Sequence, residues 1–364
     1  MSIFTDTEPD RPRRRRGRRI GWVILVLGVV CLFVVGRMPS SYAIERPGPV
    51  FNTLGTTEVS GHEVPVITIA GHKTYPTGGA LDMLTVNIDG DPDQPASWAE
   101  VAGAWFQPSQ AITPLDELYA PQQTVKQSNE EGAQQMAESQ QDATAAALYE
   151  QKIPFDSVLT VGGTVKGSPA EGVLKKGDIL DSVNGKTFID LDQVHNYVVA
   201  NGTTEPLTIV FTRDGKQMTT KITPAKSSTG PYIGVFLTAK YTFPFPVKIQ
   251  LQDVGGPSAG MMFALGIIDK LTPTKLNGGQ HIAGTGTITA SGSVGAIGGI
   301  RQKMYGARNA GANYFLAPAS NCNEVRGHIP AGLTVFATSK LSDSVTDLHA
   351  IATGTGLSKL KTCG

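Results

Sequence analysis

The feature that most constrains this chain is an apolar segment near its start. Residues 20–36, IGWVILVLGVVCLFVVG, contain no charged side chain, and seven arginines precede them within residues 1–19. The segment has the minimum length of a membrane-spanning helix, which needs roughly 17–25 residues, and exceeds the apolar part of most signal peptides. We therefore predict a basic tail over 1–19 and a transmembrane helix over 20–36.

The distribution of positive charge predicts the orientation of this helix. The arginines precede the span and only Arg37 follows it closely, so the positive-inside rule places the N-terminus in the cytoplasm and everything after Arg37 outside. This predicts a single-pass protein of the cell membrane with an extracytoplasmic main part. Ser41-Tyr42-Ala43 also fits a cleavage site, which leaves a removed leader as the alternative. Because the basic run adjoins the span, we predict no nucleic-acid partner.

The cysteines agree with an outside location. Cys31 lies within the span, and Cys322 and Cys363 are the only two that follow it. Disulfides persist in extracytoplasmic compartments, so we predict that these two pair, the alternative being two free thiols. There is no Cys-x-x-Cys pair and no histidine-rich tract, so we predict neither a metal nor a cofactor.

Residues 37–155 combine strand and helix signals. The stretch 38–60 is predicted to be an extended linker entering a strand, because it is rich in Pro and Gly, whereas 64–70 and 81–88 have the composition of strands. The Ala-, Gln- and Glu-rich stretch 128–151 predicts a helix, with Ser128 or Asn129 as N-cap and Glu131 placed for a capping box. We expect this region to pack on the later domains.

Residues 156–226 form an ordered set of short elements. The sequence predicts a strand at 158–165, a Gly-Ser-Pro-Ala turn at 167–170, a strand after Gly177-Asp178, a helix at 191–201 and a hairpin at 205–225. This order resembles a PDZ domain of the bacterial type, which implies a peptide-binding module. The entering segment IPFDSVL lacks the glycine-rich loop of PDZ peptide sites, so the sequence does not locate a peptide pocket.

One short motif in this region is a false lead. Gly185-Lys186-Thr187 looks like the end of a nucleotide-binding P-loop, but Leu180 stands where the first glycine would be needed. We therefore predict that the chain does not bind ATP.

The hexapeptide GGPSAG at 255–260 contains the pattern Gly-x-Ser-x-Gly around Ser258. A strand at 246–251, a glycine turn and an apolar helix at 258–271 give the context in which such a serine acts as a nucleophile. Gly256, Pro257 and Ala259 are small neighbours, and the helix N-terminus offers N–H groups to an oxyanion. The alternative is that Ser258 only caps the helix.

A second helix is predicted over 300–310, after Gly298-Gly299, with Gly311 ending it. Lys303 lies near its start. Apolar surroundings and the positive end of a helix both disfavour a charged ammonium, so the pKa of this lysine could fall to roughly 7–8 and allow it to act as a general base. Taken alone, Lys303 is better explained as an exposed helix lysine.

Together these stretches resemble the proteolytic domain of the Lon family of serine proteases, over about residues 230–345. The resemblance implies that Ser258 is the nucleophile, that Lys303 is the base and that Thr285 makes a supporting hydrogen bond. The matching residues are Gly256-Pro257-Ser258-Ala259-Gly260, Thr285, Gly286, Ile288, Gly292, Val294, Ile297-Gly298-Gly299-Ile300, Lys303, Ala307, Gly311, Ala312 and Pro318.

The whole layout looks like the membrane-anchored, ATP-independent Lon-like proteases with a PDZ domain found in Gram-positive bacteria. It implies a mixed α/β (α+β) multidomain fold, a C-terminal tail over 346–364, flexible or unfolded polypeptides as substrates, and a homo-oligomer. Two departures stand out. Gly255 occupies a position where Lon proteases often carry an acid, the nearest acid being Asp253, and there is no ATPase region.

Two other functions compete with this interpretation. A Ser-His-Asp hydrolase could recruit His281, His328 or His349, but the chain after Ser258 is short for that fold and lacks its oxyanion motif. The protein could also be a PDZ-type peptide-binding scaffold with an inactive protease domain. Labelling by a serine-directed reagent separates the scaffold from the protease.

Overall fold

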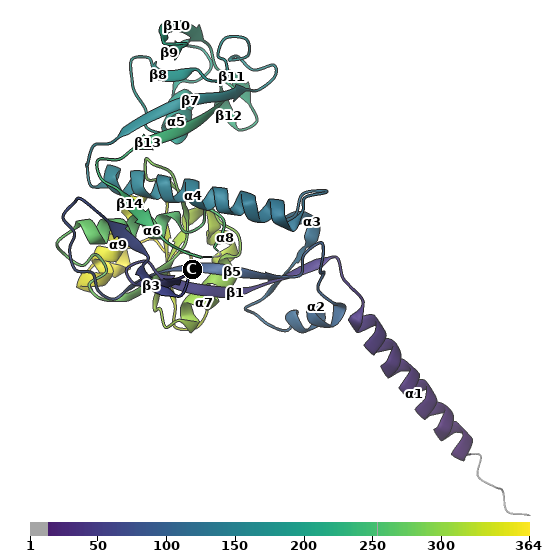
Figure 1. Cartoon of the computed structure of the whole chain (residues 1–364). Coiled ribbons are helices and arrows are strands. Elements are labelled where there is room, and N and C mark those ends of the chain that lie inside the picture. Colours follow the sequence, from purple (N-terminus) through teal and green to yellow (C-terminus); the bar gives the residue numbers. More distant parts are fainter. Residues whose placement is uncertain (1–13, 253) are drawn as a thin grey trace, which may run out of the picture. The chain divides into compact units, whose positions relative to one another are not determined.

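The computed structural model describes residues 14–252 and 254–364, so the tail before Arg14 and the predicted neighbour Asp253 lie outside the described residues. The fold is mixed α/β and multidomain, as predicted, with an apolar N-terminal helix, a PDZ-like region and a C-terminal α/β domain (Figure 1). The chain forms two compact units. One contains the residues as far as Arg46 together with Ile88–Val125, and the other contains Pro47–Asn87 and Lys126–Gly364.

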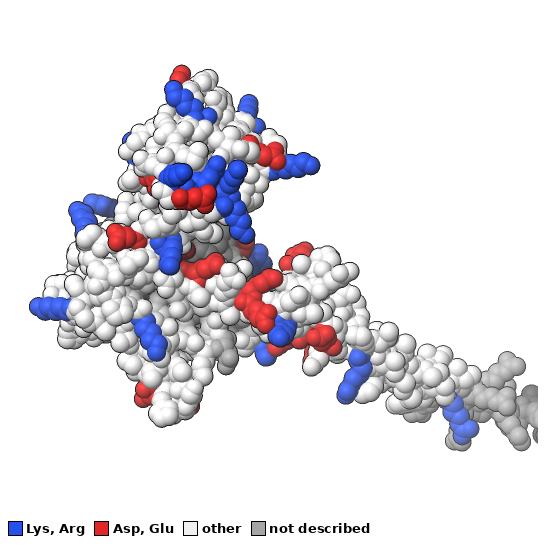
Figure 2. Space-filling model, turned by 45° about the horizontal axis from the view of Figure 1, so that its top comes forward, with Lys and Arg blue, Asp and Glu red and all other residues white. Residues whose placement is uncertain are grey.

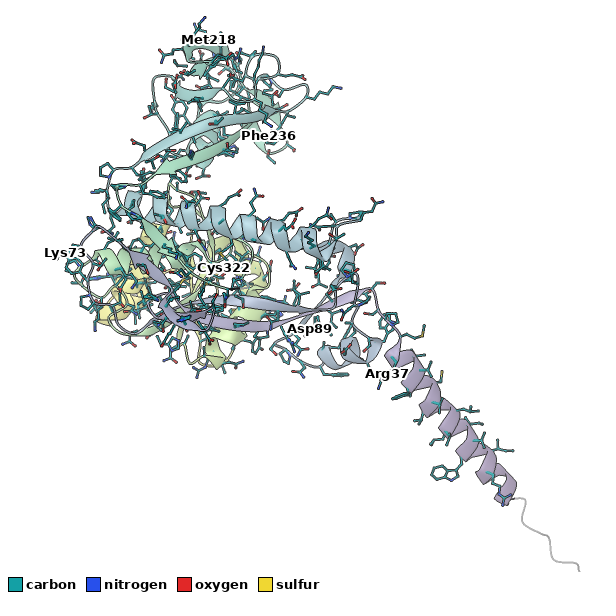
Figure 3. The ribbon with its side chains drawn as sticks, in the orientation of Figure 1. Arg37, Lys73, Asp89, Met218, Phe236 and Cys322 are labelled. Atoms are coloured by element: carbon teal, nitrogen blue, oxygen red, sulfur yellow. A yellow bond between two sulfur atoms is a disulfide. The ribbon has the colours of Figure 1, made fainter. Side chains whose placement is uncertain are left out.

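The first unit begins with the helix α1, Arg14–Arg37. Its part from Arg19 to Arg37 is apolar and long enough to cross a membrane, and its side chains are not buried against the protein. By length and composition it fits a membrane anchor or a signal sequence. Figure 2 shows the visible face of this helix free of charge between blue side chains near its ends, and Figure 3 shows Arg37 at its C-terminal end.

A small cluster forms the core of the first unit. Ile44 packs with Ala96, Val101 and Ala104, which lie on or just before α2. The first residues of strand β1, from Tyr42 to Glu45, pair antiparallel with strand β6. The elements are α2 (Trp98–Ala104), β6 (Ala111–Pro114), α3 (Leu115–Leu118) and part of β1 (Tyr42–Asn52).

The second unit is built on a sheet in the order β19-β18-β15-β5-β1. The neighbours from β5 to β19 are parallel. Its strands are β1, β5 (Ala80–Asp89), β15 (His281–Gly284), β18 (Tyr314–Pro318) and β19 (Thr334–Thr338). Two strands therefore come from before the PDZ-like region and three from after it, so the C-terminal domain is discontinuous in sequence.

Helices and short ladders complete this domain. The helix α6 is buried over nearly its whole length, as its lack of a polar face predicts. The helices are α4 (Val125–Glu150), α6 (Gly260–Leu271), α7 (Ile300–Asn309), α8 (Cys322–Val325) and α9 (Leu341–Thr353). The paired short strands are β2 (Thr56–Val59) with β3 (His62–Pro65), β4 (Ile67–Ile69) with β14 (Val247–Ile249), and β16 (Thr287–Ile288) with β17 (Val294–Gly295).

The PDZ-like region has its own core and an antiparallel sheet in the order β10-β9-β8-β7-β13. The helix α5 covers Leu191–Asn201, as predicted, and Asp190 caps its N-terminus through the N–H of Gln193. The strands are β7 (Asp156–Thr164), β8 (Ile179–Val183), β9 (Leu207–Arg213), β10 (Lys216–Ile222) and β13 (Val235–Thr242). The separate pair β11 (Ala225–Ser227) and β12 (Gly230–Tyr232) lies between β10 and β13 in the chain. The last sheet strand, β13, lies beyond the predicted limit at residue 226.

Three predictions about residues 37–155 need correction. The predicted linker at 38–60 contains the long strand β1. The helix predicted at 128–151 begins at Val125, so Ser128, Asn129 and Glu131 lie inside it and do not cap it. The region is also divided between the two units and does not pack as one piece.

Cys322 and Cys363 form a disulfide, which confirms the predicted pairing. The predicted tail at 346–364 is therefore held to the domain. Its first residues continue α9, and the N–H of Ala337 in β19 donates to the carbonyl of Lys361. The crosslink joins residues 41 apart in sequence and, on the chain-entropy estimate, stabilises the fold by up to about 4 kcal/mol.

Candidate active site

Ser258 lies where a tight loop turns into α6. Gly256 has a φ of +82°, a conformation that favours glycine, and Ala259 is the N-cap of the helix that begins at Gly260. Ser258 is only partly buried. The predicted strand, turn and helix are therefore present, with the serine just before the first helical turn.

Close backbone packing holds this serine in place. The carbonyl of Ser258 accepts from the N–H of Gly286 at 2.8 Å, and the carbonyl of Gly286 accepts from the N–H of Met261 at 3.0 Å. A side chain at Gly260 would meet Ile288 and Ser139 within 2.8 Å. The last glycine of the Gly-x-Ser-x-Gly pattern is thus required by the approach of α6 to its neighbours.

Lys303 comes from α7, whose N-cap is Gly299 with a left-handed φ of 66°. The lysine is only 3% exposed. Its Nζ lies 2.6 Å from Oγ of Ser258 and 3.1 Å from Oγ1 of Thr285. The hydroxyl of Thr285 donates to the carbonyl of Ser258 at 2.9 Å. Three predicted site residues from three separate segments therefore meet at one point.

The electrostatics of this cluster are set by burial. Removal from water disfavours the ammonium and lowers the pKa of Lys303 from 10.5 to about 8. Because the Thr285 hydroxyl donates to Ser258, its oxygen lone pairs are free to accept an N–H of Lys303. A neutral Lys303 can then turn its own lone pair toward the Ser258 hydroxyl and accept its proton.

The N–H groups around Ser258 differ in their availability. In the described part of the chain, no carbonyl accepts from the N–H of Ser258 or of Ala259, and both precede the first turn of α6. The N–H of Gly256 donates to the carbonyl of Gly132 at 2.9 Å, and Pro257 has no N–H. Of the predicted supporting residues near the serine, Ala259 is therefore the one placed to donate to an oxyanion.

The helix α4 braces the predicted nucleophile loop around Ser258, a contact that the sequence did not reveal. The hydroxyl of Ser139 donates to the carbonyl of Pro257 at 3.0 Å. Two helical turns earlier, the carbonyl of Gly132 accepts from the N–H of Gly256. Residues 132 and 139 are seven apart and so lie on one face of the helix. The only sequence signal was a glycine in a helix otherwise rich in Ala, Gln and Glu.

This contact also accounts for Gly255. A Cβ at position 255 would lie 3.3 Å from the carbonyl carbon of Gly132, closer than side chains usually approach. The acidic residue that Lon proteases often carry here would therefore press on the backbone of α4. Glycine lets the helix and the loop pack directly.

A groove of about 710 Å³ lies between α4 and the chain before Ser258. Leu251 and Val254 contribute apolar side chains on the loop side, and Met136 contributes one on the helix side. Small and polar residues of α4 complete the lining. This groove adjoins the loop that carries Ser258, since Val254 and Gly255 belong to its lining.

We predict that Ser139→Ala lowers kcat by about two- to tenfold and changes KM little, because one hydrogen bond that positions the nucleophile loop is worth about 0.5–1.5 kcal/mol. Steady-state kinetics on a peptide substrate measure this. Thr144→Ala is the matched control, since that hydroxyl donates only to the Gln140 carbonyl of its own helix. An equal loss in both variants would mean that the effect is general to α4.

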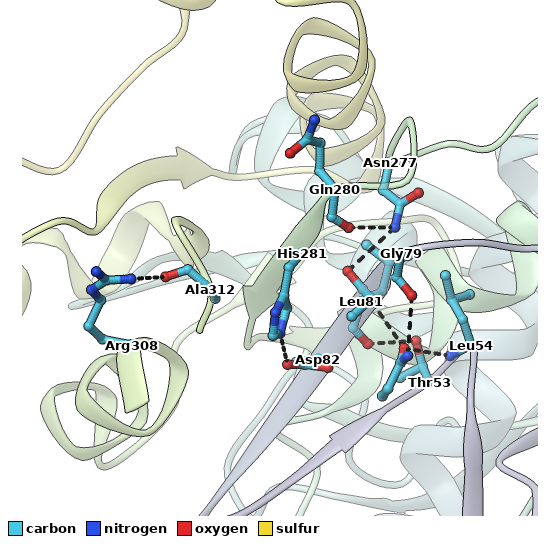
Figure 4. Close-up of polar contacts among 12 residues, drawn as sticks. Thr53, Leu54, Gly79, Leu81, Asp82, Asn277, Gln280, His281, Arg308 and Ala312 are labelled. Carbon is cyan, nitrogen blue, oxygen red and sulfur yellow. Dashed lines mark hydrogen bonds and ion pairs between the residues drawn. The ribbon is translucent and has the colours of Figure 1, made fainter. Parts of the chain in front are cut away.

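The histidines of the competing triad lie elsewhere. His281 pairs with Asp82 across β15 and β5 (Figure 4). It precedes Thr285 by four residues of extended chain, about 13 Å. His328 contacts the carbonyl of Arg326, and His349 is exposed on α9. Among the described residues, no histidine is hydrogen-bonded to Ser258, so the structure gives the triad no support.

Comparison with known proteins finds similarity in the C-terminal part of the chain. Residues 252–352 match the family model of the Lon protease (S16) C-terminal proteolytic domain. The chain is 46% identical over 77 residues to a Lon protease of Fusobacterium nucleatum, covering 21% of this chain and 10% of that protein. It is 33% identical over 100 residues to a Lon protease of Clostridium beijerinckii, covering 27% and 12%. The chain thus spans about a tenth of the length of these relatives.

Solved structures of PDZ domains align with about a fifth of the chain. The PDZ domain of an SdrC-like protein from Listeria monocytogenes aligns at 22% identity with a TM-score of 0.21, over 22% of this chain and 85% of that one. Its counterpart from Listeria innocua aligns at 24% identity with the same TM-score, over 22% and 93%.

Proposed function

We propose that this protein is an ATP-independent, membrane-anchored serine endopeptidase that uses a Ser258–Lys303 dyad. The observation that carries the proposal is the 2.6 Å contact between Nζ of Lys303 and Oγ of Ser258, with the lysine buried and its pKa lowered to about 8. Its occurrence within a Lon-type proteolytic domain supports peptide-bond hydrolysis as the reaction.

The proposed mechanism follows from the donors and acceptors around Ser258. Neutral Lys303 takes the hydroxyl proton as Oγ attacks the carbonyl carbon of the peptide bond. The N–H groups of Ser258 and Ala259 receive the developing oxyanion. The protonated Lys303 then gives its proton to the leaving amine. Water attacks the acyl-enzyme with Lys303 again as base, which releases the acid product and restores the serine.

Thr285 supports both steps without touching the substrate. Its hydroxyl fixes the Ser258 carbonyl, and its oxygen orients the amine of Lys303. The amine of Lys303 is then held by two contacts, one to Oγ of Ser258 and one to Oγ1 of Thr285, which keep its lone pair directed at Oγ. Thr285 is therefore a positioning residue in this proposal.

The proposed substrate class follows from which polypeptides can reach the Ser258–Lys303 dyad. For an endopeptidase that does not use ATP to unfold its substrates, we propose polypeptides that are already flexible, received by the groove between α4 and the loop that carries Ser258. The PDZ-like region contains no side chain of the dyad, so we assign it to the control of substrate access. With α1 as the anchor, the substrates are extracytoplasmic.

The test is cleavage of one protein in two states. We expect the full-length protein in detergent or nanodiscs to cleave a reduced and carboxymethylated polypeptide, to spare the same polypeptide in its native disulfide-bonded form, and to be unaffected by ATP with Mg²⁺. The Ser258→Ala variant serves as the inactive control. A requirement for ATP would contradict the proposal, and a total lack of cleavage and of serine labelling would favour the peptide-binding scaffold.

A further inference from the structure

An exposed aromatic surface lies beside the apolar helix in the first unit. Trp98 is 43% exposed, Trp105 77% and Phe106 84%. With Tyr42, Val101 and Ile112 they line a groove of about 560 Å³. We propose that this aromatic surface, defined by Trp98, Trp105 and Phe106, is a second membrane contact that lies in the interfacial zone of the outer leaflet.

The sequence of α2 separates two faces. Trp98 and Trp105 are seven residues apart, so they lie on one side, two turns from each other. Val101 and Ala104 point into the small core with Ile44. Trp98 packs edge-on against Tyr42, with ring centroids 5.9 Å apart, which fixes its orientation. The exposed aromatic side chains are therefore held outward by a folded support.

The position of α2 follows from contacts at the end of α1. The N–H of Ser40 donates to the carbonyl of Ala96 at 2.8 Å, and the N–H of Trp98 donates to the carbonyl of Met38 at 3.1 Å. A Cβ at Gly36 would lie 3.4 Å from Cβ of Ala99, so the last turn of α1 touches the first turn of α2. Figures 1 and 3 show α2 next to this end of the helix, where Arg37 is labelled.

These contacts fix how deep the aromatic surface lies in the membrane. The apolar part of α1, Arg19–Arg37, has 19 residues and so spans about 28 Å, close to the hydrocarbon thickness of about 30 Å. Its last turn then reaches the hydrocarbon boundary. The helix α2 starts beside that turn and is about 10 Å long, comparable with the interfacial zone of about 5–8 Å on each side.

The chemistry of the surface favours lipid as its occupant. Tryptophan is enriched in the interfacial zone, where its ring lies among acyl chains and its N–H reaches water and headgroups. The surface continues the apolar face of the span through Met38, itself half exposed. The charged residue within α2 is Glu100, which caps its own helix with Ser97, so basic attraction to anionic lipids is not the basis of binding. A partner protein is the occupant that the experiment below would reveal instead.

The inference rests on the part of the proposed function that makes α1 a membrane anchor, and single-tryptophan variants separate the two claims. The chain has three tryptophans, Trp22, Trp98 and Trp105. W22F/W98F retains Trp105, and W98F/W105F retains Trp22 as the matched control within α1. Each full-length variant is placed in phosphatidylcholine nanodiscs whose acyl chains carry bromines either near the headgroups or near the bilayer centre.

We expect headgroup-proximal bromines to reduce Trp105 emission at least twofold, deeper bromines to reduce it less, and neither effect to change with salt or added anionic lipid. Quenching of Trp22 but not of Trp105 would overturn the inference and leave the anchor intact. Absence of quenching at both would refute the anchor and the inference together. Shielding of Trp105 from acrylamide without quenching by lipid would assign the surface to a protein partner and would also overturn it. If Trp98→Phe unfolds the unit, W22F alone retains both outer tryptophans and gives the same readout.

Discussion

Lys303→Arg should reduce kcat/KM for peptide hydrolysis by about 10⁴-fold or more, with the protein still folded. A guanidinium remains charged at any working pH and cannot accept the Ser258 proton, so the conservative replacement fails chemically. Ser258→Ala should lose as much, because the nucleophile itself is removed. The double variant should be no worse than either single one, since the two residues act as a unit.

The measurement is hydrolysis of an unfolded polypeptide by the purified full-length variants, with thermal unfolding as the check on folding. Lys270→Arg on α6 is the matched control, because it makes the same change at a lysine that contacts neither Ser258 nor Thr285 through a hydrogen bond among the described residues. Near-wild-type activity in folded Lys303→Arg would end the dyad mechanism and return attention to the histidines.

Lys303→Met should stabilise the fold at pH 7 by up to about 3 kcal/mol. Burial lowers the pKa of Lys303 from 10.5 to about 8, so the unfolded chain binds its proton more tightly than the folded protein does. At about 1.4 kcal/mol per pKa unit, this difference favours the unfolded state. An apolar side chain of similar length removes that penalty and keeps the volume filled.

The sign of the pH dependence follows from the same shift. Below pH 8 the folded and unfolded states are both protonated and the penalty is at its full value. Between pH 8 and 10.5 only the unfolded state binds the proton, so wild-type stability rises with pH and the advantage of Lys303→Met shrinks. Denaturant unfolding of both proteins at pH 7 and pH 10 tests this. If Lys303→Met were no more stable than the wild type at pH 7, or if its gain in stability were equal at pH 7 and pH 10, a buried lysine with a lowered pKa would be contradicted.

The sequence was most informative where local signals decide the structure. The helix α5 covers Leu191–Asn201 as predicted, because the spacing of its apolar residues and the glycine that follows Asn201 are local signals, whereas its N-cap Asp190 came only from the structure. The β9–β10 hairpin followed from Asp214-Gly215, which adopt φ values of 50° and 74°. The segments around Ser258 and Lys303 were located in the same way, from glycines and an apolar helix.

Long-range contacts account for what the sequence missed. Pro47, Gly48 and Pro49 made the segment of β1 look like a linker, yet the chain is held there as a strand of the sheet. The bracing of the nucleophile loop by Gly132 and Ser139 joins residues more than a hundred positions apart, which no local pattern encodes. For the same reason, Gly255 looked like a departure from the family pattern until its contact with α4 was known.

The most direct test of a neutral lysine base is the pH dependence of Ser258 acylation by a fluorophosphonate probe, with the modified residue identified by peptide mass spectrometry. Acylation needs the lysine without its proton, so the rate should rise about tenfold per pH unit below pH 8 and level off above it. The account predicts one titration with an apparent pKa near 8 and labelling of Ser258 alone. A titration near 6.5, the ordinary value of histidine, or a rate that does not change with pH, would contradict it.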